Sequence, residues 1–115
     1  MATEIGHCIA DLADRLESQG NRSFAEQLRA QSLRISGILA EGSSCPTKPA
    51  FAEFVAEARA ATLKIANLVI FLAERELVSE EEEANLVNML KREAKMLENF
   101  RQSLERAGQP EMVVA

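Results

Sequence analysis

"KIANLVIFLA", residues 64–73, is a nearly unbroken apolar run in an otherwise acidic chain. After Lys64, its single polar residue is Asn67. A membrane-spanning helix needs about 20 consecutive apolar residues. The run begins at Lys64 and is followed at once by Glu74 and Arg75, so it is too short to span a membrane. We therefore expect these residues to lie in a helix that fills a core or contacts another chain.

The composition indicates one packed, acidic domain. The chain has 115 residues, of which 47% are hydrophobic, with only 5 glycines and 3 prolines, and this composition favours a single helical domain. Thirteen basic against eighteen acidic residues give a net charge of -5, which disfavours binding to phosphate backbones and anionic lipid. Residues 1–17 lack the basic flank and apolar stretch of a secretory signal, and Cys8 and Cys45 are far apart. We expect a cytoplasmic protein with two free thiols.

Hydrophobic periodicity predicts four helices and no strand. The predicted ranges are 4–18, 23–42, 50–77 and 80–107. The spacing of serine and glutamate predicts capping boxes at Ser23–Glu26 and Ser79–Glu82. Gly42 is expected to close the second helix in a left-handed conformation, and Pro49 to lie in the first turn of the third.

Short connections between long helices place neighbouring helices antiparallel. The predicted fold is therefore all-α, an antiparallel up-down-up-down four-helix bundle. Residues 1–108 are expected to form its single domain, and residues 109–115 a flexible tail that follows Gly108.

The predicted helix 50–77 is more apolar than one bundle core requires. At 100° per residue, its polar residues leave an apolar arc of roughly 220°. A continuous apolar strip of this kind is typical of an interface between copies of a chain. The residues predicted to form it are Val55, Arg59, Leu63, Ala66 and Ile70. The alternative is that the helices on either side wrap further around this helix than in an ideal bundle.

No motif in the sequence predicts catalysis or a cofactor. A di-iron bundle needs two Glu-x-x-His motifs, whereas Glu4 and His7 form a single one and His7 is the only histidine. Cys8 beside His7 supplies too few ligands for a tetrahedral metal site. Neither a Gly-x-Ser-x-Gly nucleophile motif nor a glycine-rich phosphate loop occurs. We predict no catalytic residue, no metal and no cofactor.

Three segments resemble a known bacterial family. They are "LRAQSLRISGILAEG" (28–42), "FAEFVAEARAATLKIANLVIFLA" (51–73) and "VSEEEEANLVNMLKREAKMLENFRQSL" (78–104). They are similar to the four-helix-bundle proteins of ribosomal-RNA intervening sequences. The resemblance implies a cytosolic homopentameric ring without enzymatic activity. It also implies kinship with the basic accessory variability determinant of diversity-generating retroelements, which binds nucleic acid.

Together, these features predict a non-enzymatic assembly or scaffold protein that forms a homo-oligomer and presents an acidic surface to an unknown protein partner. In this hypothesis Arg59 bridges to a carboxylate of the neighbouring subunit. The alternative is an accessory nucleic-acid-binding protein that uses Lys91, Arg92 and Lys95, although the net charge of -5 disfavours it.

Overall fold

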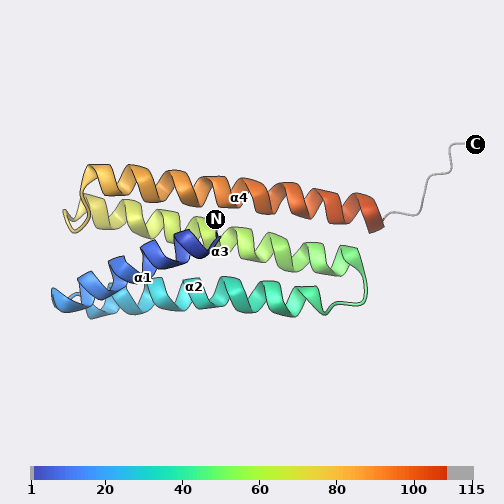
Figure 1. Cartoon of the computed structure of the whole chain (residues 1–115), viewed down its shortest axis with the longest axis horizontal. Helices are drawn as coiled ribbons and strands as arrows, with labels where there is room; N and C mark the ends of the chain where they lie inside the picture. The colour runs from blue at the N-terminus through green and yellow to red at the C-terminus, as the bar shows by residue number, and fades with distance from the viewer. Residues whose placement is uncertain (1, 109–115) are drawn as a thin grey trace, which may run out of the picture.

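The computed structural model describes residues 2–108, and within that range the chain consists of four helices and no strand. The helices are α1 (Ala2–Ser18), α2 (Arg22–Ser43), α3 (Lys48–Glu74) and α4 (Glu80–Gly108). They follow one another up and down along a common long axis (Figure 1). The all-helical fold expected from the sequence is thereby confirmed. The predicted tail, residues 109–115, lies outside the described residues.

The connections between the helices are short and use specific backbone chemistry. Gly20 adopts a positive φ of 87° between α1 and α2, a conformation that glycine adopts without a steric penalty. Thr47 caps α3 by accepting a hydrogen bond from the Ala50 amide at 3.3 Å. Pro49 lies in the first turn of α3, as predicted. Ser79 likewise accepts a hydrogen bond from the Glu82 amide at 3.1 Å at the start of α4.

Two of the predicted helix signals are wrong. Ser23 does not cap α2, because that helix already begins at Arg22 after Asn21 and makes no side-chain cap hydrogen bond. Gly42 does not end the helix in a left-handed conformation but lies inside α2, where it is buried. A Cβ atom at this position would lie 2.7 Å from Phe51 Cδ1 and from Phe54 Cβ. Gly42 is therefore required for close packing of α2 against α3.

The core consists of two apolar clusters along the bundle. The larger one joins all four helices and includes Ile9, Leu12 and Leu16 of α1, each at most 1% exposed. The smaller one contains no residue of α1. Its buried members come from α2, α3 and α4: Ile38, Ala52, Val55, Ala58, Leu97 and Leu104.

The difference between the clusters follows from the short length of α1. At 1.5 Å per residue, 17 residues extend about 25 Å, whereas the 29 residues of α4 extend about 43 Å. Figure 1 shows α1 crossing only one half of the bundle, while α2, α3 and α4 continue into the other half. Among the described residues, α1 packs mainly against α2, and α2 and α4 make no close backbone contact. The second half is thus built from three helices.

Candidate assembly surface

One face of α4 continues past the end of α1. In its first half this face contacts α1, since Glu82 accepts hydrogen bonds from Arg15 at 2.6 and 3.0 Å and Met89 packs against the larger core cluster. Residues spaced seven, four, three and four apart fall on one side of a helix. The residues with this spacing are Glu82, Met89, Glu93, Met96 and Phe100. Met96 and Phe100 therefore lie on the side of α4 that faces α1, but beyond the point where α1 begins.

The opposite wall is formed by α2 in the same way. Arg29 donates to Asp14 of α1 at 2.6 Å, which marks the side of α2 that faces α1. Ser32 and Leu39 continue along this side at helical spacing, and both line a cavity together with Ile9 of α1. The α1-facing sides of α2 and α4 therefore both extend into the three-helix half.

Phe51 occupies the corner between these two walls. It lies on the stripe of α3 that includes Thr62 and Ile65, which line the same cavity under α1. Its ring contacts Phe100 of α4 edge to face, with centroids 5.3 Å apart, and it packs against Gly42 of α2. A single aromatic side chain thus contacts both α2 and α4.

The apolar side chains of this region are incompletely covered. Met96 is 50% exposed and Phe100 is 41% exposed, although both are large apolar residues on an α1-facing side. We call this surface the open face. It consists of Ile35, Leu39, Phe51, Met96 and Phe100, of which the first three are half-buried.

A stripe of four uncharged exposed residues adjoins the open face on α2. Leu33, at 75% exposure, is the most exposed large apolar residue among those described. Its exposed neighbours at helical spacing are small: Ser36, Gly37 and Ala40. We call these four residues the α2 edge. None of the four carries a charge, whereas Arg34 and Glu41 beside them are exposed and charged.

The structure corrects the predicted interface on α3. Val55 and Ala66 do not point away from the core, because they are only 0% and 3% exposed within one copy of the chain. Ile70 is half-buried and packs against the larger core cluster, and Leu63 is half-buried as well. The alternative considered above is therefore correct for Val55 and Ala66: the neighbouring helices wrap around α3 and cover them.

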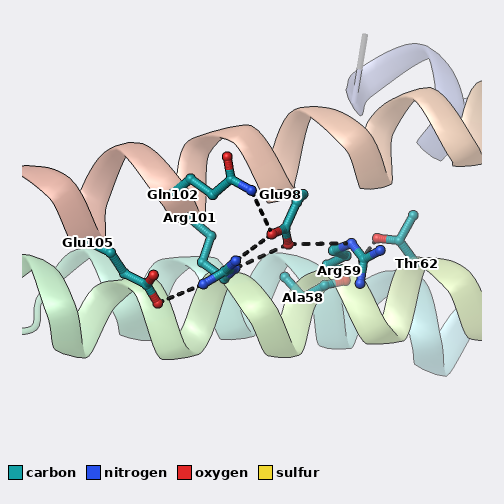
Figure 2. Close-up of polar contacts among 7 residues, drawn as sticks. All are labelled: Ala58, Arg59, Thr62, Glu98, Arg101, Gln102 and Glu105. Carbon is teal, nitrogen blue, oxygen red and sulfur yellow. Dashed lines mark hydrogen bonds and ion pairs between the residues drawn. The ribbon is translucent and has the colours of Figure 1, made fainter.

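Arg59, the remaining residue of the predicted interface, takes part in a charged network within its own chain. Its Nε lies 3.7 Å from Glu98 Oε2 on α4, and Figure 2 shows the Glu98 carboxylate between Arg59 and Arg101. Arg101 also donates to Glu105 at 2.6 Å. Hydrogen bonding from Arg101, assisted by Gln102 and the charge of Arg59, lowers the pKa of Glu98 to about 2. The network joins α3 to α4.

The three basic residues of the alternative hypothesis do not form one cluster. Lys91 and Lys95 are exposed and line the same shallow depression as Arg59 and Glu98, on the seam between α3 and α4. Arg92 instead lines a depression with Glu4 on the seam between α1 and α4. A carboxylate therefore accompanies the basic residues on each seam.

The described side chains that could bind a metal or act as nucleophiles do not form a cluster. Within residues 2–108, no group of three or more histidine, cysteine or carboxylate side chains is placed to hold a metal ion. His7 is exposed, and Cys8 and Cys45 are both free thiols. In the same part of the chain, no helix is long and apolar enough to cross a membrane.

Comparison with known proteins returned no significant similarity. Neither a protein-family model, nor a curated protein, nor a solved structure matches the chain.

Proposed function

We propose that this chain is a non-enzymatic assembly protein that forms a homo-oligomer through the open face and the α2 edge. The observation that supports this proposal is the exposure of large apolar side chains where α2, α3 and α4 continue past the described residues of α1. Met96 and Phe100 are 50% and 41% exposed there. Contiguous exposed apolar surface is characteristic of protein interaction sites.

The charge distribution favours a second copy of the same chain as the partner. A chain of net charge -5 repels its own copies wherever charged surfaces meet. The open face and the α2 edge contain only apolar residues, serine and glycine. Contact between two copies through these residues therefore brings fewer like charges together than contact through the charged remainder of the surface, and a basic partner would gain little attraction from them.

The shape of the surface is also suitable for contact between helices. Gly37 has no side chain and Ala40 only a methyl group, which permits close approach of another helix, and Leu33, one turn before Gly37, projects into solvent. A Cβ atom built on Gly37 meets no other atom of the protomer within 4 Å, so there is room for a neighbouring chain. The pentameric ring remains an implication of the family resemblance, and the acidic remainder of the surface is then available to a further protein partner.

Light scattering on the purified chain tests this proposal. We expect the wild type to have a multiple of the protomer mass, 12.6 kDa. The double variant Met96→Glu/Phe100→Glu should be a folded monomer, because each copy would place two carboxylates at the contact. A variant that keeps the wild-type mass would show that another surface mediates assembly.

Phe71→Glu is a matched control. Phe71 is 44% exposed, close to the 41% of Phe100, but lies on α3 away from the open face. Each ring has one aromatic neighbour: Phe24 at 5.8 Å for Phe71 and Phe51 at 5.3 Å for Phe100. Phe71→Glu should therefore perturb the fold to a similar extent and leave the oligomer intact. A monomeric wild type would overturn the proposal outright.

A further inference from the structure

Three basic residues, Arg59, Lys91 and Lys95, line one depression on the seam between α3 and α4, and Glu98 is the only carboxylate that lines it with them. We call it the α3–α4 depression. Its volume is about 550 Å³, and its other lining residues are Leu63, Ala94, Asn99 and Gln102. By contrast, the depression between α1 and the start of α4 is lined by three carboxylates and no basic residue. The α3–α4 depression is thus locally positive on a chain of net charge -5.

The carboxylate of Glu98 is already bound by neighbouring groups of α4. Arg101 donates to both of its oxygens, from Nε at 3.1 Å and from Nη2 (Figure 2). Gln102 donates to Oε1 at 3.2 Å. The negative charge of Glu98 is therefore largely compensated by Arg101, and it neutralises little of the positive charge that lines the depression.

The three basic residues retain hydrogen-bond donors for a ligand. Arg59 is 42% exposed, and its Nε lies 3.7 Å from Glu98 Oε2, beyond hydrogen-bond distance. Lys91 and Lys95 are exposed, and within residues 2–108 neither forms an ion pair with a carboxylate. They are four residues apart on α4, and like charges at this spacing disfavour a helix. A bound anion would reduce this repulsion.

We infer that the α3–α4 depression binds a small organic phosphate. Each ammonium or guanidinium group would donate a charge-assisted hydrogen bond to a phosphate oxygen, and the forked donors of Arg59 match the geometry of a phosphate group. Three cations around one ligand favour an anion with two charges over an anion with one. The half-buried Leu63 offers an apolar contact for the organic part of the ligand.

This site does not depend on the proposed oligomer, because it lies on the other side of α4 from the open face. Lys91 and Phe100 are nine residues apart, so at 100° per residue they point in opposite directions. Arg92 lines a different depression. The basic residues of the α3–α4 depression therefore form one isolated site and not a continuous track for a nucleic acid.

Phenyl phosphate and phenyl sulfate are suitable probes, because they have similar shapes and differ in charge. The second pKa of a phosphate monoester is about 6, so at pH 8 phenyl phosphate carries two negative charges and phenyl sulfate one. Isothermal titration of the full chain at low salt should show phenyl phosphate binding at least about tenfold more tightly. Lys91→Gln/Lys95→Gln should remove this preference.

Lys48→Gln/Lys64→Gln is the matched control. It removes two exposed lysines of α3 that do not line the depression, so the net charge changes equally and the preference should persist. Glu98→Gln provides a variant of the opposite sign. It removes the carboxylate from the wall and should strengthen binding of phenyl phosphate severalfold.

Three results of the titration would each overturn the inference: equal affinity for the two probes, a preference that survives in Lys91→Gln/Lys95→Gln, or no binding of either probe. Tight binding of RNA or DNA at physiological salt that is lost in the same double variant would also overturn it, in favour of the nucleic-acid hypothesis. None of these outcomes depends on the oligomeric state, which light scattering reports separately.

Discussion

Phe51 of α3 and Phe100 of α4 meet edge to face, with ring centroids 5.3 Å apart and an interplanar angle of 88°. This geometry is favourable for aromatic pairs. Together the two rings join α3 to α4, and Phe51 packs against the smaller core cluster, which contains no residue of α1. The pair stabilises the three-helix half from within, yet it leaves Phe100 41% exposed. The same side chain therefore contributes to the fold and to the proposed contact.

Because Phe51 packs against Gly42, replacing Gly42 with alanine should affect the stability of the protein very differently from replacing Gly37. Gly42→Ala would place a Cβ atom 2.7 Å from Phe51 Cδ1 and Phe54 Cβ, and overpacking of this kind destabilises by about 1–3 kcal/mol. Gly37→Ala meets no other atom of the protomer within 4 Å and should stabilise α2 of the monomeric Met96→Glu/Phe100→Glu variant by up to about 1 kcal/mol, since alanine favours the helix.

Urea unfolding of the two variants measures this difference in the free energy of unfolding. Both substitutions add one methyl group to the same helix, so intrinsic helix propensity cancels in the comparison. Equal effects of Gly42→Ala and Gly37→Ala would mean that α2 and α3 are not in close contact at Gly42.

Because Ala66 is buried, a charged side chain at this position of α3 should destabilise the fold. Ala66 is 3% exposed, so Ala66→Glu would bury an unpaired carboxylate and should prevent folding or destabilise the protomer by several kcal/mol. Leu63 is half-buried on the seam between α3 and α4, so Leu63→Glu should be tolerated better. Circular dichroism and thermal unfolding distinguish the two. A well-folded Ala66→Glu variant would show that the flank of α3 is accessible after all.

Sequence periodicity was sufficient to predict the four helices, because the apolar stripes of residues 5–16 and 86–104 have clear helical spacing. Periodicity was insufficient for α3, because counting angles around one helix does not show how much of its surface the neighbouring helices cover. Val55 and Ala66 were therefore wrongly predicted to face outward. Gly42 was misread because a close interhelical contact and a helix end both select glycine. The open face could not be found without knowing which part of α4 the helix α1 contacts, although the helical spacing of Met89, Met96 and Phe100 is evident in the sequence.

The ion pairs of Glu98 predict a pH dependence of stability. Its pKa is lowered from an ordinary value of 4.5 to about 2, mainly by hydrogen bonding from Arg101. A carboxyl group with a lower pKa in the folded chain contributes stability that is complete above pH 4.5 and is lost as the pH falls towards 2. Glu98→Gln should therefore be less stable than wild type at pH 6, and the difference should shrink on acidification. Denaturant titrations at several pH values measure it, and a pH-independent difference would contradict this assignment.

The attachment of α1 should depend on its apolar face more than on its ion pair. Leu12 is 1% exposed in the core, and Leu12→Ala should cost about 2–5 kcal/mol. Arg15 pairs with Glu82 at 2.6 Å but is 43% exposed, so Arg15→Gln should cost at most about 1 kcal/mol. Hydrogen exchange of the α1 amides provides the measurement. Comparable losses of protection in the two variants would contradict a mainly apolar attachment.

Nucleic-acid binding should be weak, because Lys91 and Lys95 share their seam with Glu98 while Arg92 lies on another. We expect labelled RNA and DNA to show no binding at physiological salt. Tight, salt-sensitive binding that is lost in Lys91→Glu/Lys95→Glu would instead support the nucleic-acid hypothesis, since phosphate contacts weaken steeply with salt.

The chain contains no tryptophan, so one tryptophan introduced into the open face can report by its fluorescence whether this face is covered in the oligomer. Positions 100 and 71 are 41% and 44% exposed within one protomer, so we expect similar quenching of Phe100→Trp and Phe71→Trp in a monomer and protection of Phe100→Trp by contacts between copies. Acrylamide quenching of fluorescence at a concentration where the wild type is oligomeric should be clearly weaker for Phe100→Trp. Equal quenching at the two positions would contradict assembly through the open face.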